Sequence, residues 1–452
     1  MVVVPRLDNA RTLASQLRES LSMKVGFAYH PQDIDPQRIQ VWVVTSGCLL
    51  QLLAQERSNK ILPNLKLVLC EDLELLNDTY ELGLSLLLHS TQTKPVRVVG
   101  LAAALGDAEA LADWLGVPSE GLYCFPPTER DQALSLTFQT FTIPYSAALM
   151  KAMAKPVYDS IQHLPVSESA IIFVPSTSQC GSVVAELVTQ CALAMNLRGF
   201  LGDSVSQDIL EGQASFLKDR NLMDGVMRGF GIWHDRMHQT DKILTLRLFA
   251  EGVIRVMVIP RELCWNAPVR AGLVIAMGTQ YAVGSYAGPD GSTKRSERRI
   301  MEYSLHELVR MQGRAVRHGK TGRFHILCQA EHRETYMRFL TEGMPLESQL
   351  LGDDDAETLG SEVLKKWLKH QRTNGTIKSQ QDVLDFLSLT LLTRRVEKNP
   401  SYYDADGDRV VFLSRVVDSL WEQTAPEADV STKVLNSTQL QNDGKRQSQT
   451  TT

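Results

Sequence analysis

Three acidic residues that follow a short apolar run are the clearest candidates for chemistry in this chain. In the stretch LVLCEDLELL, residues 67–70 are typical of a buried strand, and Glu71, Asp72 and Glu74 follow it. Ligands of parallel α/β sheets bind beyond the carboxyl ends of the strands. Carboxylates at that place can hold Mg²⁺. The pattern leaves three interpretations open: a magnesium site, an eroded form of one, or surface acids at a strand end.

Two other stretches imitate chemical motifs. GRAVRHGKTG has five residues between Gly313 and Gly319, more than a Walker phosphate loop allows, and it follows a helix instead of a strand. HDRMH has the histidine spacing of zinc proteases, but Asp235 stands where the catalytic glutamate would be. We interpret the first as a basic turn and expect no metal site at the second.

The elements that must position these residues form a regular alternation. Short apolar runs alternate with amphipathic stretches, which predicts an α/β fold with parallel sheets covered by helices on both faces. The alternation pauses near TFQTFTIPYS and then resumes, so we expect two lobes with a cleft between them. The predicted strands are Val2–Val4, Val41–Val44, Leu67–Leu69, Val96–Leu101, Ile171–Val174, Val253–Ile259, Leu273–Met277 and Phe324–Cys328.

After about Gly360 the sequence pattern predicts helices and no further strands. Ser379 and Asp382 have the spacing of a capping box at the start of one of these helices. From about residue 425 the chain is polar and charged, and it cannot bury enough apolar area to fold. The predicted domains are a first lobe at 1–150, a second lobe at 151–350, a helical domain at 351–424 and a disordered tail at 425–452.

Composition restricts the classes of function. The 452 residues are 43% hydrophobic and 22% charged, which is ordinary for a globular protein. A net charge of −5 argues against a globally basic nucleic-acid-binding protein but leaves room for a local RNA groove. Seven scattered cysteines indicate a reducing compartment. The chain contains neither an apolar run of membrane-spanning length nor a signal-peptide pattern at MVVVPRLDNA, so we expect no membrane partner.

The stretches, taken in order, resemble superfamily-two DExH RNA helicases. Within that family they are similar to the degenerate second cassette of the large two-cassette spliceosomal helicase of the small nuclear ribonucleoprotein. The resemblance implies two RecA-like lobes followed by a winged-helix domain, and it runs from residue 1 to about residue 423. The stretches that carry it are VVVPRLDNARTLASQL, VVTSGCLLQLL, EDLE, GLAAALGDAEALADWLG, AMAKPVYDSI, IIFVPS, RELCWNAPV, LVRMQGRAVR and TRRVEKNPSYY.

The resemblance implies that the acids are remnants of a catalytic site. In active members, the first acid of the DExH motif holds magnesium and the second positions water. Here the order is Glu71 then Asp72, and Glu74 replaces the histidine. Each exchange of Asp and Glu moves a carboxylate by about one methylene, and a displacement near 1 Å can reduce catalysis roughly 100-fold.

Other motifs of the family are altered as well. Alanines at 102–104 replace the hydroxyl residues of motif III, and Asn266 and Pro268 stand in motif V. Motif VI keeps Arg314 and Arg317, which the resemblance implies are either remnants of arginine fingers or salt-bridge partners across the lobes. In the same motif Arg310 replaces the leading glutamine.

The candidate nucleic-acid contacts come from two sources. Thr45 and Ser176 lie in stretches that resemble motifs Ib and IV. The loop STKRSERR carries four cations that could touch RNA phosphates, although a solvated loop is the alternative. These cations are Lys294, Arg295, Arg298 and Arg299.

The sequence begins at the family's motif Ia, so the phosphate-loop strand and helix are not part of it. Either the sequence is a fragment or the protein lacks that segment. We expect a degenerate, catalytically inactive helicase cassette in the nucleus that serves as a platform for spliceosomal proteins and an active helicase cassette. No cofactor is expected; ATP and magnesium would bind only if a phosphate loop lies upstream of Met1. The alternatives are part of an active ATP-dependent RNA helicase and an ATP-independent RNA-binding module.

Overall fold

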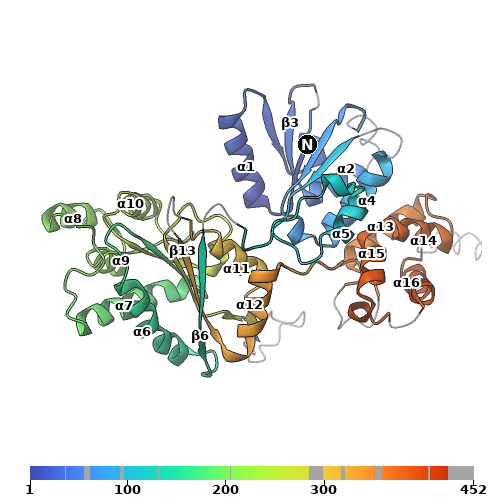
Figure 1. The fold of residues 1–452 in the computed structure, drawn as a ribbon. Helices are drawn as coiled ribbons and strands as arrows, with labels where there is room; N and C mark the ends of the chain where they lie inside the picture. Colours follow the sequence, from blue (N-terminus) through green and yellow to red (C-terminus); the bar gives the residue numbers. More distant parts are fainter. Residues whose placement is uncertain are drawn as a thin grey trace, which may run out of the picture.

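Two parallel sheets and a helical C-terminal unit make up the computed structural model (Figure 1). The tail predicted at 425–452 lies, except for residue 425, outside the described residues, and none of the described helices has the length and apolarity needed to cross a bilayer. The structure describes residues 1–35, 37–54, 62–91, 96–129, 133–203, 205–284, 299–316, 321–352, 359–405 and 408–425.

The first sheet has five parallel strands in the order β2-β3-β1-β4-β5. All three residues of β1 are buried because this strand is in the middle of the sheet. Since all strands run the same way, their carboxyl ends meet at one edge. The elements are β1 Val2–Val4, α1 Leu7–Ser20, β2 Val25–Ala28, β3 Val41–Thr45, α2 Ser46–Ala54, β4 Leu67–Cys70, α4 Asp78–Thr91, β5 Arg97–Gly100 and α5 Glu109–Leu115.

The second sheet has six parallel strands in the order β6-β13-β10-β7-β9-β8. An antiparallel hairpin of β11 and β12 extends from it. The elements are β6 Leu134–Phe141, α6 Ala147–Gln162, β7 Ala170–Val174, α7 Thr177–Leu193, α8 Gln207–Ala214, α9 Arg220–Val226, β8 Phe230–Ile232, α10 Gln239–Ala250, β9 Val256–Pro260, β10 Leu273–Met277, β11 Gln280–Val283, β12 Arg299–Glu302, α11 Leu305–Gln312, β13 Gly322–Gln329 and α12 Arg333–Glu342.

The eight predicted strands are confirmed, but the predicted lobe boundary is wrong. Strand β6 lies within the range predicted for the first lobe, 1–150, yet it pairs along its whole length with β13 of the second sheet. The pause that we expected in this stretch is therefore an edge strand. None of its residues is fully buried, and polar residues interrupt the apolar ones, so it lacks the continuous apolar run of the central strands.

The C-terminal unit consists of helices around their own core, and the predicted capping box is confirmed. Ser379 Oγ accepts a hydrogen bond from the Asp382 backbone N–H at 3.3 Å, and Asp382 Oδ2 accepts one from the Ser379 N–H at 2.9 Å. Leu364, Leu387 and Val416 are fully buried in this core. The helices are α13 Glu362–Thr373, α14 Gln380–Ser388, α15 Leu391–Lys398 and α16 Arg409–Gln423.

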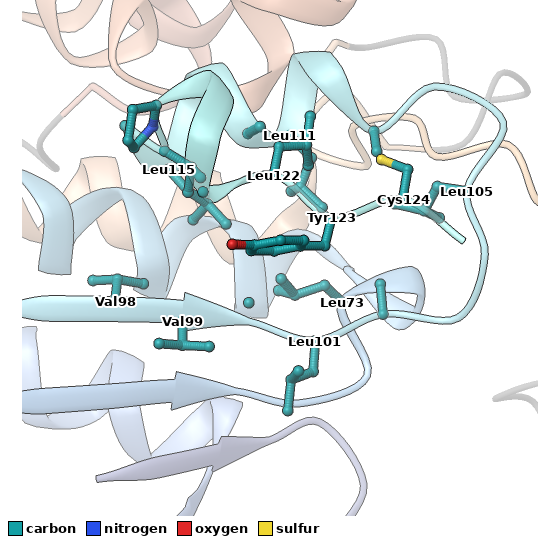
Figure 2. Close-up of a pocket in the computed structure, with 18 of the residues that line it drawn as sticks. Leu73, Val98, Val99, Leu101, Leu105, Leu111, Leu115, Leu122, Tyr123 and Cys124 are labelled. Carbon is teal, nitrogen blue, oxygen red and sulfur yellow. The ribbon is translucent and has the colours of Figure 1, made fainter. Parts of the chain in front are cut away.

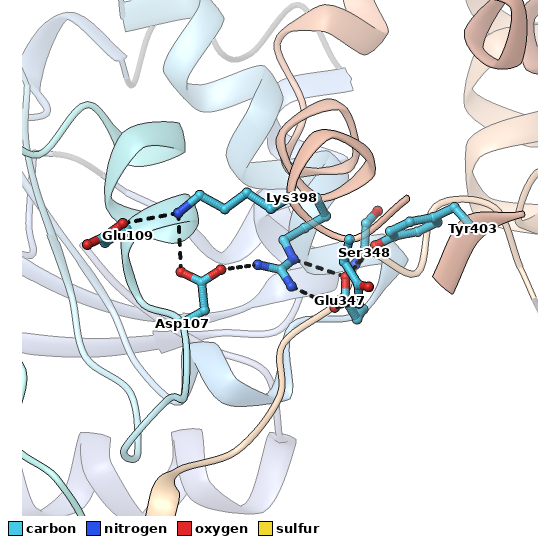
Figure 3. A network of polar contacts seen from close by, with 8 residues as sticks. Asp107, Glu109, Glu347, Ser348, Lys398 and Tyr403 are labelled. Atoms are coloured by element: carbon cyan, nitrogen blue, oxygen red, sulfur yellow. Dashed lines mark hydrogen bonds and ion pairs between the residues drawn. The ribbon is translucent and has the colours of Figure 1, made fainter. Parts of the chain in front are cut away.

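An ion network connects this unit to the first lobe (Figure 3). The largely buried Arg395 on α15 donates to Glu347 at 2.6 and 3.0 Å and to Asp107 at 2.6 Å. Lys398 donates to Asp107 at 3.4 Å and to Glu109 at 3.2 Å. Asp107 does not cap α5, whose N-cap position is Ala108. Its carboxylate instead forms ion pairs with Arg395 and Lys398 of the C-terminal unit.

A second contact between these parts involves a buried carboxyl group. Glu81 on α4 is fully buried, and its Oε1 accepts a hydrogen bond from the Leu392 N–H at 3.0 Å. Its Oε2 has no hydrogen-bond partner in the described parts of the chain. Burial raises the pKa of Glu81 to about 7, although the Ser348 side chain and backbone N–H groups oppose that rise. The group is therefore largely protonated in the folded protein below neutral pH.

We expect Glu81→Gln to remove a pH dependence of stability. The unfolded pKa of Glu81 is 4.5 and the folded value is about 7. The contribution of Glu81 to the free energy of unfolding is fully present below the unfolded pKa. It is lost as the pH rises through the folded pKa, a change on the order of 3 kcal/mol. Urea unfolding between about pH 5 and pH 8 measures this. The exposed Glu211→Gln is the control, and equal pH slopes in the two variants would contradict the prediction.

Candidate functional site

The acidic stretch lies at the carboxyl edge of the first sheet, as predicted. Its backbone continues the sheet, because the Glu71 N–H donates to the Val3 carbonyl at 2.9 Å. Asp72 then adopts φ 52°, and a short 3₁₀ turn follows at Leu73–Leu75. A left-handed backbone costs a non-glycine residue roughly 1–2 kcal/mol and is concentrated at functional sites. This turn directs the Asp72 and Glu74 side chains toward the second lobe.

Arg310 binds both acids across the cleft between the lobes. From α11, its guanidinium donates to Asp72 Oδ1 and, at 2.9 Å, to Glu74 Oε1. The Glu74 side chain is only 3% exposed, and its Oε2 accepts the Ala103 N–H at 3.0 Å. Asp72 Oδ2 accepts from Asn9 Nδ2 at 3.2 Å. We call the contacts of Arg310 with Asp72 and Glu74 the Arg310 bridge.

An aromatic residue of the second lobe joins this region. The Trp265 ring centre is 5.4 Å from the Arg310 guanidinium carbon and 4.4 Å from that of Arg6 on the first lobe. Both distances allow cation–π attraction. Trp265 therefore adds a second contact between the lobes beside the Arg310 bridge.

A cavity of about 400 Å³ remains next to the bridge, with Glu71 in its lining. Burial and the adjacent Asp72 raise the pKa of Glu71. Within the described ranges, no three His, Cys, Asp or Glu side chains are grouped so that they could hold a metal ion. Asp72 and Glu74 do not fit Mg²⁺, because the guanidinium of Arg310 already occupies carboxylate oxygens that would coordinate the ion.

Known proteins are similar to this chain in sequence and in fold. The U5 small nuclear ribonucleoprotein 200 kDa helicase of Homo sapiens is 31% identical over 342 residues, which cover 75% of this chain and 15% of that protein. DExH-box ATP-dependent RNA helicase DExH14 of Arabidopsis thaliana is 33% identical over 74% of this chain and 15% of that protein. The chain is a relative of the DExH-box RNA helicases. It spans about 15% of the length of these relatives.

The winged-helix domain and the helicase fold are also supported. A Winged Helix-turn-helix domain matches residues 361–436. The crystal structure of the DEAH/RHA helicase HrpB from Escherichia coli superposes with a TM-score of 0.51 at 17% identity, covering 83% of this chain and 40% of that one. The predicted fold class of two RecA-like lobes followed by a winged-helix domain is confirmed.

Of the two arginines kept from helicase motif VI, the described one, Arg314, is bonded within its own lobe and not to the acids. Arg314 donates to the backbone carbonyls of Cys264 at 3.1 Å and Trp265 at 3.2 Å, both within the second lobe. Burial lowers its pKa. Arg317 lies outside the described residues. The structure thus brings together Glu71, Asp72 and Glu74, and pairs two of them with Arg310 instead of Arg314.

The candidate RNA contacts lie at several places. Thr45 is buried, and its hydroxyl accepts the Cys48 N–H at 3.2 Å at the start of α2. Ser176 precedes α7, and its hydroxyl donates to Gln179 at 2.9 Å. Arg299 is exposed at the start of β12. Their roles in RNA binding stay predictions, and Lys294, Arg295 and Arg298 lie outside the described residues.

The partnership of Arg310 with Glu74 is the feature that sequence reasoning missed. Both positions differ from the helicase family: glutamate stands for histidine in one motif and arginine for glutamine in the other. Two replacements of opposite charge in motifs that face each other are a signal of direct pairing. The contributions of Asn9 and Trp265 had no comparable signal.

We expect Arg310→Gln to loosen the contact between the lobes. It removes the cation and leaves two partly buried carboxylates without it, which favours opening of the cleft. Small-angle scattering should show a larger maximum dimension for this variant than for the wild type. A double-mutant cycle with Glu74→Gln, measured on the free energy of unfolding, should give a coupling energy of about 1–3 kcal/mol. Arg314→Gln is the matched control, because its hydrogen bonds stay within one lobe. Identical scattering of the wild type and Arg310→Gln would refute the expectation.

Proposed function

We propose that this chain is a degenerate RNA helicase cassette that serves as a protein-interaction platform in pre-mRNA splicing and does not hydrolyse ATP. The observation that carries the proposal is the Arg310 bridge. In an active member of the family, the acids would serve magnesium and water. Here a guanidinium takes two of the three acids and joins the lobes instead.

The bridge also supports the expectation that no cofactor is needed. Magnesium would have to displace a cation that already donates hydrogen bonds to Asp72 and Glu74. Charge-assisted hydrogen bonds of this kind are about twice as strong as neutral ones. A cassette whose lobes are joined by its own side chains has no requirement for nucleotide to bring them together.

The partners and location follow from the relatives. One relative is named a helicase of the U5 small nuclear ribonucleoprotein, and it is far longer than this chain. We therefore assign spliceosomal proteins and an active helicase cassette as partners, and the nucleus as the location. RNA binding is weak in this proposal, because the cleft cation Arg310 is already paired with Asp72 and Glu74 and the chain carries a net charge of −5.

We expect the purified chain to release no phosphate from ATP above background, with or without RNA. The reason is that its cleft acids are paired with Arg310. A phosphate-release assay with magnesium and single-stranded RNA measures this, and mock-purified protein is the control. RNA-stimulated release that Asp72→Ala and Arg317→Ala both abolish would overturn the proposal of an inactive cassette.

We also expect protein partners to stay bound in a pull-down from splicing extract after RNase treatment and at raised salt. Protein interfaces depend on apolar burial, whereas RNA contacts weaken steeply with salt. Charge reversal at Arg314, Arg317 and the 294–299 loop should reduce RNA binding and leave the protein partners. Release of every protein by RNase or by these reversals would favour an RNA-binding module instead.

A further inference from the structure

One edge of the second sheet is formed by a long strand that lacks the features which usually protect such an edge. Strand β6 is the outermost strand of this sheet and has eight residues, LSLTFQTF, none of them charged or proline (Figure 1). Edge strands of natural proteins are usually short, or they carry charges or proline that hinder pairing with another chain. The opposite edge of the same sheet follows this rule, because β8 has only three residues. Both β6 and its neighbour β13 lie far from either end of the sequence.

The backbone groups on the open side of β6 belong to every second residue. The Gly322 N–H donates to the Ala133 carbonyl at 2.8 Å, so Ala133 and every second residue after it direct their backbone groups toward β13. The residues between them direct their N–H and C=O groups away from the sheet. These residues are Leu134, Leu136, Phe138 and Thr140. Among the described residues, these outward groups have no hydrogen-bond partner, so they form a template for another strand.

The sequence of β6 makes the strand complementary to itself. A two-fold axis through Thr137, perpendicular to the sheet, sets a second copy of β6 antiparallel beside the first. In this register Leu136 faces Phe138 of the second copy and Leu134 faces its Thr140, so that each outward residue meets an outward residue. Opposed aliphatic and aromatic side chains stabilise such a strand pair, and like charges would destabilise it. The uncharged strand sets no like charges opposite each other.

The apolar residues of β6 already lie at the margin of a core. Leu134, Leu136 and Phe138 are partly buried and pack against the core of the second lobe. In the two-fold register they come next to the same residues of the second copy, so pairing would continue this core from one molecule into the next. Apolar burial would then add to the hydrogen bonds of the new strand pair.

We infer that a second copy of this chain binds along β6, so that the two six-stranded sheets join into one across a two-fold axis. Strand addition to a sheet edge is a general mode of association, and a two-fold contact needs only one surface that fits itself. The uncharged strand argues against RNA as the occupant, because phosphates bind where cations are available. The inference adds a dimer interface to the cassette and does not depend on the proposed role in splicing.

Cysteine cross-linking of the full chain tests both the interface and its register. Thr137 directs its backbone groups toward β13, so the two copies of this residue would form a non-hydrogen-bonded pair with Cα atoms about 4.5 Å apart. A disulfide can span that distance. Under mild oxidation, Thr137→Cys should therefore give a covalent dimer on non-reducing gels.

Ser135→Cys is the matched control. Ser135 is exposed like Thr137 and lies on the same face of the strand. Its two copies would be roughly 13 Å apart, too far for a disulfide. Both variants are made together with Cys124→Ser, because Cys124 is an exposed free cysteine. Equal cross-linking of the two variants, or none in either, would overturn the inference.

Opposite charges at the two-fold axis provide an independent test. In analytical ultracentrifugation the wild-type chain should sediment at twice its mass of 50.4 kDa. Thr137→Lys and Thr137→Glu should each sediment at the mass of one chain, because like charges would face each other. A mixture of these two variants should restore the dimer, and Thr137→Val, which has no charge, should remain dimeric.

Circular dichroism shows whether the charged variants fold, and the cross-linking result decides if they do not. A wild-type chain that stays monomeric would overturn the inference. So would a Thr137→Lys variant that dimerises as well as the wild type.

Discussion

The position of the two lobes depends on one guanidinium group. Arg310 contributes the cation that Asp72 and Glu74 need, and both acids are largely shielded from water. Ion pairs of this kind add little net stability, because desolvation offsets much of the Coulomb attraction. They do impose geometry, since any arrangement that separates the partners leaves buried charge uncompensated. The bridge therefore specifies one orientation of the lobes more than it stabilises the fold.

The loop after β5 extends this constraint to the C-terminal unit. Its Ala103 N–H donates to Glu74, while its Ala104 carbonyl accepts from the Met344 N–H at 2.8 Å. A few residues after Met344, the Glu347 carboxylate accepts hydrogen bonds from Arg395 of α15. The cleft, the loop and the winged-helix unit are thus linked by consecutive contacts.

The arrangement separates the cleft from the surface as places of function. In the cleft, Asp72 and Glu74 are engaged by Arg310, Asn9 and the Ala103 N–H, so these acids are not free for a ligand. The cavity along β5, lined by apolar side chains such as Leu111, Leu115 and Tyr123, has the opposite character (Figure 2). A fold can thus keep its architecture while its function moves to another site.

The sequence by itself determined eight of the described strands, the order of the helicase-like motifs and the capping box at Ser379, because these depend on residues that are close along the chain. It also located the acids after β4. Only the tertiary structure decided their partner, since Arg310 is 238 residues from Asp72. It also placed β6 in the second sheet and gave Asp107 a partner 288 residues away. Local patterning records burial and spacing, but pairing between distant charges exists only once the lobes have packed.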